Sequence, residues 1–269
     1  MDTEFDFTVV KRYYHISPEG ADSPIYELPA ARFMNPEDLL AALHTSGQTV
    51  QAISNALPGS FIGTSLCKLG NIQLLFAAQY DRLIDLSADN LIYQIERHGD
   101  HTHLGYKIKE LRSAPIPSSL EQREAFWIAH WQSFFGEFIT PSVEAIAAGA
   151  GLKAEAIWQQ FGGQLTLLKE FLSEHEPRAD VLRKFEEDSR TLAEQIEPEW
   201  FKRRRNPFVH QPRYTENPLN PEEKWQIQSS CCMYDRRENG VKCYTCPRMT
   251  AAEREEQACA MLESAGAGA

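Results

Sequence analysis

The sequence has 269 residues, of which 42% are hydrophobic and 24% charged, an ordinary composition for a globular protein with one large domain or two small ones. Its formal net charge of −11 excludes nucleic-acid binding by the molecule as a whole. The charge is unevenly spread: residues 201–248 hold ten Lys or Arg against five Asp or Glu, a net charge of +5, so the rest carries −16.

Targeting signals are the next feature to consider. No stretch approaches the roughly 20 apolar residues that cross a bilayer, and the acidic start Met1-Asp2-Thr3-Glu4 does not resemble a secretory signal. We therefore expect a cytoplasmic protein with no transmembrane segment. A reducing compartment disfavours a disulfide framework for the six cysteines, so a cluster of four indicates a metal site or a catalytic one.

The first part of the chain changes character at Asn35. Residues 1–33 are mixed and contain three prolines, which favours an irregular or weakly helical arm. A helix is predicted after Asn35, which can cap it, with Pro36 in its first turn. Residues 58–60 (Pro-Gly-Ser) predict a break, and an apolar helix is expected from Thr64 to Tyr80.

The periodicity then becomes that of a strand. Apolar and polar residues alternate on both sides of Gly99-Asp100, which predicts a β-hairpin within residues 90–111 and a turn at that dipeptide. His98, His101 and His103 lie near the turn, and we interpret them as a solvated hairpin tip rather than a metal site.

Helical periodicity returns after the hairpin. Ser118-Ser119 resembles a capping box, and the aromatic residues from Trp127 to Phe138 predict one buried helical face. Further helices are predicted from Thr140 to about Gly149, from Lys153 to Phe161 with a break at Gly162-Gly163, and from Arg178 to Ile196. The expected fold is mainly α with a small β-hairpin or sheet element (α+β).

After Pro198 the sequence becomes basic and rich in proline, so we predict two regions. Residues 1–200 form a mainly helical body with a β-hairpin near residues 90–111. Residues 201–269 form an extended, proline-rich connector, a cysteine segment and a short charged helix from Ala251 to Leu262. The basic run Lys202 to Arg205 is interpreted as a solvated surface. Outside the segment, Cys67 is expected to be a buried small hydrophobe and Cys259 a spare thiol.

The cysteine segment has the spacing C-C-x10-C-x2-C, formed by Cys231, Cys232, Cys243 and Cys246. Asn239-Gly240 predicts a turn that folds the insert back, so that four thiolates converge. Four thiolates suit a [2Fe–2S] cluster and also a structural Zn²⁺ ion. The spacing leaves both open, although adjacent cysteines are awkward ligands for one metal because their side chains diverge. The surrounding basic residues favour thiolates.

This segment resembles the C-terminal motif of the FhuF-type ferric siderophore reductases, which have the same cysteine pair, a similar insert and a final Cys-x-x-Cys. Asn206-Pro207-Phe208 and Ile157-Trp158 also resemble that family. The resemblance implies a [2Fe–2S] cluster on the four cysteines and a cytoplasmic role in removing iron from hydroxamate siderophores. Ser229-Ser230 departs from the common motif, which has Arg-Arg or Arg-Thr before the cysteine pair.

The function expected from the resemblance is one-electron reduction of ferric siderophore iron. The sequence has no G-x-G-x-x-G and no P-loop, so the electrons are expected from a separate ferredoxin or reductase, which the basic region would dock. Two alternatives stay open, a non-enzymatic iron–sulfur carrier or sensor and a zinc-stabilised interaction module. No residue is assigned to siderophore binding, for which we expect a cleft between the body and the cysteine segment.

Overall fold

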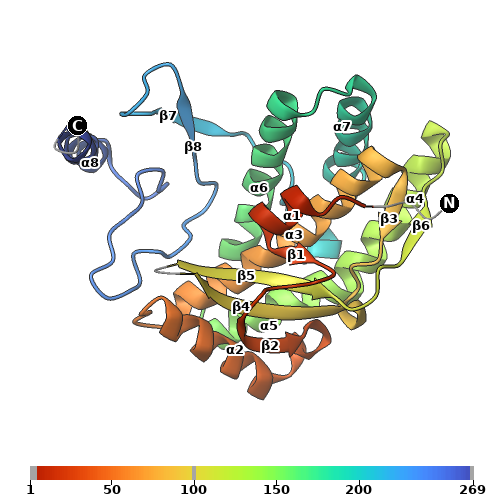
Figure 1. Cartoon of the computed structure of the whole chain (residues 1–269), viewed down its shortest axis with the longest axis horizontal. Helices are drawn as coiled ribbons and strands as arrows, with labels where there is room; N and C mark the ends of the chain where they lie inside the picture. The colour runs from red at the N-terminus through yellow and green to blue at the C-terminus, as the bar shows by residue number, and fades with distance from the viewer. Residues whose placement is uncertain (1–4, 99–100, 267–269) are drawn as a thin grey trace.

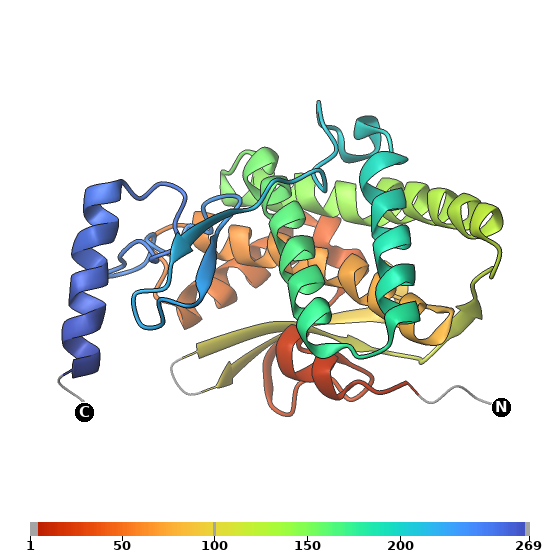
Figure 2. The ribbon, with the colours of Figure 1, turned by 90° about the horizontal axis from the view of Figure 1, so that it is seen from above.

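The computed structural model describes residues 5–98 and 101–266, and its centre is the long helix α3 (Ala56–Tyr80). Figure 2 shows the main β-sheet on one side of the layer of helices that contains α3. In Figure 1 the C-terminal segment lies to one side of this body, with α8 (Ala251–Gly266) at the periphery. The fold is mainly helical with small sheets, as predicted.

Helix α3 is buried on nearly every face, because α2, α5, α6, α7 and the sheet all pack against it. Among the described residues it is the one helix long and apolar enough to cross a membrane. However, 83% of its most apolar window is buried inside the structure, which is the property of a core helix. Its composition is therefore explained by packing.

The main sheet has four strands in the order β1-β5-β4-β2. The predicted hairpin strands are confirmed as β4 (Leu91–His98) and β5 (His101–Ile108), while its turn lies outside the described residues. Strand β1 (Ile16–Ser17) pairs with β5 in parallel, and β2 (Pro24–Pro29) pairs with β4 in antiparallel orientation.

The prediction of an irregular or weakly helical arm over residues 1–33 is therefore wrong where the chain forms strands. This region contains α1 (Thr8–Tyr14), strands β1 and β2, and the start of the 3-10 helix η1 (Ala30–Met34). The prolines at the two ends of β2 concealed the strand. They are tolerated because β2 is one of the two edge strands of the sheet, where an N–H can be missing.

Helix α2 (Pro36–Thr49) begins as predicted, since the Asn35 side chain accepts hydrogen bonds from the N–H groups of Glu37 (3.1 Å) and Asp38 (3.2 Å). The predicted break at residues 58–60 is wrong. Helix α3 starts at Ala56, so Pro58 lies in its first turn, where a helix needs no N–H donor from it.

The aromatic stripe is core, as predicted. Helix α4 (Leu120–Ser133) continues through a π-helical turn, η3 (Phe134–Ile139), into α5 (Thr140–Ala150). The rings of Trp127 and Trp131 stack at 4.8 Å between centroids, and both are fully buried. The predicted capping box does not form, because the Ser119 side chain makes no cap hydrogen bond.

Helix α6 (Ala154–His175) runs without interruption, so the predicted break at Gly162-Gly163 is also wrong. The two glycines instead allow other segments of the chain to approach the helix closely. A Cβ atom on Gly162 would lie 2.6 Å from Cβ of His210, and one on Gly163 would lie 2.4 Å from Oγ of Ser229. The C-terminal region can therefore lie directly on the helix only because these positions have no side chain.

The remaining elements complete the body and the connector. Helix α7 (Ala179–Glu194) confirms the last predicted body helix, and α8 confirms the terminal one. The connector was predicted as extended, but it contains a hairpin. The elements not yet given are β3 (Arg82–Ile84), η2 (Ala88–Asn90), β6 (Ser113–Pro115), η4 (Pro198–Phe201), β7 (Arg213–Glu216) and β8 (Lys224–Ile227).

Candidate metal centre

The insert between the two cysteine pairs folds back at the predicted place. Asn239 has a left-handed backbone (φ 54°), and the Gly240 N–H donates to the carbonyl of Arg237 (2.9 Å). No strand ladder forms within residues 231–246, so the insert is a series of turns rather than a hairpin. The turn still places Cys231-Cys232 opposite the Cys-x-x-Cys loop.

Backbone contacts with the body replace the missing ladder. The Ile53 N–H donates to the Arg236 carbonyl (3.1 Å), and the Glu238 N–H donates to the Gln51 carbonyl (2.9 Å). The Tyr234 ring stacks on Phe61 of α3, at 6.2 Å between centroids. The insert is thus attached to the loop between α2 and α3 and to α3 itself.

The four thiols lie in two pairs. Among the four thiols, Cys232 interacts most strongly with Cys243, and Cys246 interacts most strongly with Cys231. Among the described residues no group of three or more His, Cys, Asp or Glu side chains converges on one point, so the expected convergence of four thiolates is replaced by this paired arrangement. The adjacent residues Cys231 and Cys232 belong to different pairs, in keeping with the divergence of neighbouring side chains.

Backbone amides point at three of the sulfurs in the same way. The N–H of the residue two positions later donates to the sulfur of Cys232, Cys243 and Cys246; the donors are Tyr234, Thr245 and Arg248. Hydrogen bonds of this kind stabilise a thiolate, which is the metal-binding form of cysteine. The loops therefore place amide dipoles where negatively charged sulfur needs them.

Side chains supply two further contacts. Thr245 Oγ1 lies 3.9 Å from Cys243 Sγ, and the Arg248 guanidinium lies 3.8 Å from Cys231 Sγ. The contact with Cys232, together with those from Thr245, holds the pKa of Cys243 below its ordinary value, whereas the contact with Cys243 and burial raise the pKa of Cys232. Arg248 brings a positive charge to the one cysteine for which we describe no amide donor.

Helix α8 fixes the Cys-x-x-Cys loop from outside. Arg254 donates to the carbonyls of Tyr244 (3.1 Å) and Cys246 (3.0 Å), and Lys242 forms an ion pair with Glu253 (2.6 Å). The two hydrogen bonds of Arg254 connect the loop carbonyls directly to α8. The terminal helix therefore contributes to the geometry of the cysteines although it buries none of its own residues.

The donor set fits a [2Fe–2S] cluster. Such a cluster has two iron ions that each take two terminal thiolates, and the thiols here occur as two pairs with N–H donors aimed at the sulfurs. One tetrahedral Zn²⁺ ion would require the four sulfurs around a single point. We therefore predict Cys231, Cys232, Cys243 and Cys246 as the cluster ligands.

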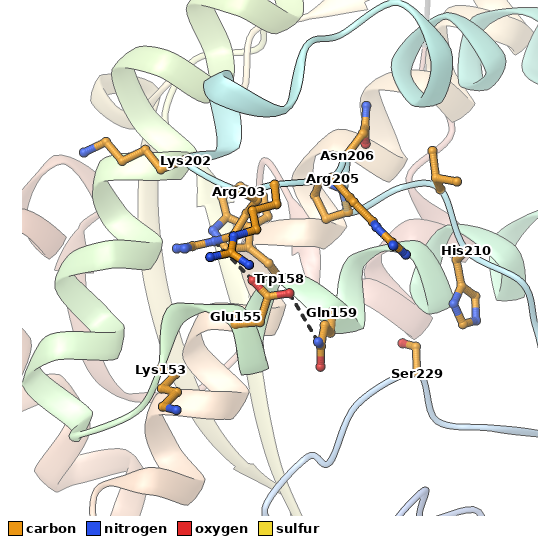
Figure 3. A pocket seen from close by; sticks show the side chains of 13 residues that line it. Lys153, Glu155, Trp158, Gln159, Lys202, Arg203, Arg205, Asn206, His210 and Ser229 are labelled. Carbon is orange, nitrogen blue, oxygen red and sulfur yellow. Dashed lines mark hydrogen bonds and ion pairs between the residues drawn. The ribbon is translucent and has the colours of Figure 1, made fainter.

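A cavity of about 1190 Å³ lies beside the cysteine segment (Figure 3). Lys153 and Lys202 are on one side of it, and His210 and Ser229 are on the other. Ser229 stands two residues before Cys231, so the two Cα atoms are at most about 7 Å apart along the chain. The lining residues are Lys153, Glu155, Trp158, Gln159, Lys202, Arg203, Arg204, Arg205, Asn206, Pro207, Val209, His210 and Ser229.

The basic run from Lys202 to Arg205 is exposed at three of its four residues, as its interpretation as a solvated surface requires, and it also lines this cavity. Its position is set by Asn206, whose side chain donates to the carbonyls of Leu192 (2.8 Å) and Ile196 (2.9 Å) and accepts from the Phe208 N–H (2.9 Å). The buried Asn206 amide thereby ties the run to the end of α7.

The other residues singled out from the sequence have structural roles. Cys67 is buried and Cys259 is exposed, both as predicted. Of the three histidines interpreted as a solvated hairpin tip, His101 is exposed as expected. His103 is instead half-buried and stacks on His15 at 4.0 Å between centroids, and the His98 side chain lies outside the described residues. The structure adds a contact that the sequence did not indicate: Trp225 of β8 packs edge-on against Tyr244 of the Cys-x-x-Cys loop at 5.6 Å between centroids.

Sequence reasoning missed several residues around the centre. Lys153 and His210 gave no signal because each stands alone in the sequence. Arg248 directly follows Cys246-Pro247, and its proximity to the motif was a usable signal. Gly163 was read as a helix breaker, although a glycine inside an apolar helix also indicates the close approach of another segment.

A comparison with protein families identifies the same segment of the chain. No curated protein matches the chain. Residues 229–248 match the family described as the FhuF 2Fe-2S C-terminal domain, and this range contains all four paired cysteines together with Ser229 and Arg248. The C-terminal segment of this chain is therefore similar to the [2Fe–2S] domain of the FhuF-type family, and [2Fe–2S] is the cofactor it indicates.

Proposed function

We propose that the protein is a cytoplasmic ferric siderophore reductase, which reduces Fe³⁺ in a siderophore by one electron and so releases Fe²⁺. The observation that carries the proposal is the large cavity adjoining the [2Fe–2S] segment through Ser229. A substrate in this cavity is close to the cysteines without having to displace them.

Reduction suits the release of iron because of ligand chemistry. Fe³⁺ is a hard ion that siderophore oxygens hold tightly, whereas Fe²⁺ is softer and exchanges its ligands more readily. The [2Fe–2S] cluster supplies single electrons, which match the one-electron step from Fe³⁺ to Fe²⁺. The electron enters from a separate ferredoxin or flavoprotein reductase, and the siderophore leaves without a broken covalent bond.

The chain's own residues have separate tasks in this proposal. The amide donors at Tyr234, Thr245 and Arg248 stabilise thiolates, and α8 holds the loop that carries Cys243 and Cys246. The residues of the cavity bind the ferric complex. An acidic donor protein would dock on the exposed basic side chains Arg236 and Arg248, and a donor-to-protein rate that did not change with salt would contradict that docking.

The proposal is tested with protein purified without oxygen and reduced with dithionite. We expect addition of a ferric siderophore to restore the visible absorption of the oxidised cluster while a ferrous chelator captures Fe²⁺ in equal amount. A coloured protein that no ferric siderophore reoxidises would be a carrier or sensor. A colourless protein with one zinc ion would be an interaction module, and the reductase proposal would be wrong.

A further inference from the structure

The cavity beside the cysteine segment has an unbalanced positive charge. Five of its lining residues are Lys or Arg, and Glu155 is its one acidic lining residue among those described. Arg203 is neutralised, because it forms ion pairs with Glu144 and with Glu155 (3.7 Å for the latter).

The other four cations are available to a ligand. Lys153, Lys202, Arg204 and Arg205 are exposed and form no ion pair with any residue that the structure describes. They come from two segments about 50 residues apart, the start of α6 and the connector, yet they line one cavity. On a chain with net charge −11, such a site provides local attraction for an anion that the rest of the molecule repels.

Buried polar atoms at the cavity also lack partners. The indole N–H of Trp158, a residue that is 1% exposed, and Nε2 of His210 have no hydrogen-bond partner among the described residues. Burial lowers the pKa of His210, which favours its neutral form. Because a buried donor without a partner is costly, polar groups of this kind indicate a ligand or ordered water. The cavity thus extends from exposed cations to the buried Trp158, which suits a compact molecule better than a protein surface.

We infer that this cavity binds a ferric chelate with a net negative charge, and that its cations select anionic over neutral siderophores. The inference rests on the proposed function and names its substrate class. Three hydroxamates balance Fe³⁺ and give a neutral complex, whereas catecholate and hydroxycarboxylate groups, or hydroxamates with additional carboxylates, give an anionic one. The family resemblance implies hydroxamate siderophores. Of these, the inference retains the hydroxamates that carry additional carboxylates, and it adds the anionic catecholate and hydroxycarboxylate chelates.

The same cations favour the reduction step. One electron from the donor protein converts an Fe³⁺ chelate into an Fe²⁺ chelate with one more negative charge, and no other bond changes. Cations fixed in place stabilise the more negative product and so make the chelate easier to reduce. Binding and reduction therefore require the same charge arrangement in the cavity.

The test uses Ga³⁺ chelates, which resemble ferric chelates in charge and shape but are not reduced, so binding is measured apart from electron transfer. Calorimetric titration of the cluster-containing protein measures the Kd of three chelates: a Ga³⁺ tris-catecholate, a Ga³⁺ citrate–hydroxamate and a neutral Ga³⁺ tris-hydroxamate. We expect the anionic chelates to bind more tightly, and their Kd to increase with salt while that of the neutral chelate does not.

Variants locate the site. The double substitution R204Q/R205Q should weaken binding of the anionic chelates by roughly tenfold and leave the neutral chelate unaffected. R190Q changes an exposed arginine on α7 outside the cavity and should have no effect.

Equal binding of neutral and anionic chelates, or equal loss in R190Q and R204Q/R205Q, would overturn the inference. Reduction of neutral siderophores alone would also overturn it while leaving the proposed function intact, whereas tight binding without reduction would overturn the function and not the site.

Discussion

The body and the cysteine segment are stabilised by different means. The body has a continuous core in which helices α3 to α7 and the sheet bury large aromatic and aliphatic side chains. In residues 228–266 only Ser230, Cys231 and Cys246 are buried, and α8 buries nothing. The segment is held by hydrogen bonds, among them its backbone contacts with residues 51–53.

This difference shows where the cofactor contributes to folding. A segment with so little apolar burial cannot offset its conformational entropy by packing alone. Metal binding that occurs only in the folded form adds its free energy to folding. We therefore expect the cluster to be a structural element of residues 228–266, whereas the body needs no cofactor to fold.

The largest effect is expected from Cys243→Ser. Serine removes one thiolate of the Cys232–Cys243 pair, so the iron and sulfide content should fall to background and the visible absorption should be lost. Far-UV circular dichroism and the thermal midpoint of the body should change little, because its core does not include the segment. Hydrogen exchange of residues 228–266 should become much faster.

Cys259→Ser is the matched control, because this exposed thiol lies on α8 outside both cysteine pairs. It should keep the iron content and spectrum of the natural protein. If Cys243→Ser kept a full cluster, the ligand assignment would be wrong. If it unfolded the body as well, the two regions would be one cooperative unit and the comparison would fail.

A smaller effect is expected at the junction of the two regions, from Gly163→Ala. The added Cβ would lie 2.4 Å from Ser229 Oγ, so the segment has to shift away from α6, at a cost of about 1–3 kcal/mol in segment stability. Hydrogen exchange of residues 226–231 should increase accordingly. Gly70→Ala on α3 is the control: its Cβ would be 3.8 Å from Trp131, and the change should stabilise the body by up to about 1 kcal/mol. Equal effects of the two variants would show that α6 does not support the segment.

The elements found from the sequence are those whose signal is local. The apolar period of α3 and the alternation of β4 and β5 follow directly from residue spacing, and the C-C-x10-C-x2-C spacing identifies the cysteine segment. The pairing of Cys231 with Cys246 could not be predicted, because it depends on how two loops approach each other in three dimensions.

The errors have one physical origin: the local structure that a residue adopts depends on partners that are distant in the sequence. Prolines at the ends of β2 indicated an irregular arm, although an edge strand accepts them. Gly162-Gly163 indicated a break, but their role is to admit His210 and Ser229. Lys202 to Arg205 gave the signal of a solvated run, which is correct for three of its residues, but only the fold brings Lys153 and Ser229 to the same cavity.

The smallest effect concerns the tuning of the centre by Arg248. Its guanidinium lies 3.8 Å from Cys231 Sγ and adds positive charge where Ser229-Ser230 replaces the arginines common in the motif. Arg248→Gln removes this charge, and reduction adds an electron to the centre, so the reduced form should lose the most stabilisation. We expect the reduction potential to fall by on the order of 50 mV, since about 59 mV corresponds to a tenfold change for one electron.

Arg236→Gln is the control that distinguishes the contact of Arg248 with Cys231 from the summed positive charge of the segment. Arg236 belongs to the same segment and is exposed, and its hydrogen bonds to other described residues come from its backbone: its N–H donates to the Met233 carbonyl (2.8 Å) and its carbonyl accepts from the Ile53 N–H (3.1 Å). A redox titration followed by visible absorption should show a clear decrease for Arg248→Gln, a smaller one for Arg248→Lys and almost none for Arg236→Gln. Equal shifts in both glutamine variants would mean that the summed charge of the segment sets the potential. A decrease of the reduction potential in Arg248→Gln alone would instead show that a segment with almost no core still positions one guanidinium against one sulfur. The turn from Cys246 to Met249 and the hydrogen bonds of Arg254 to the same loop would provide that positioning.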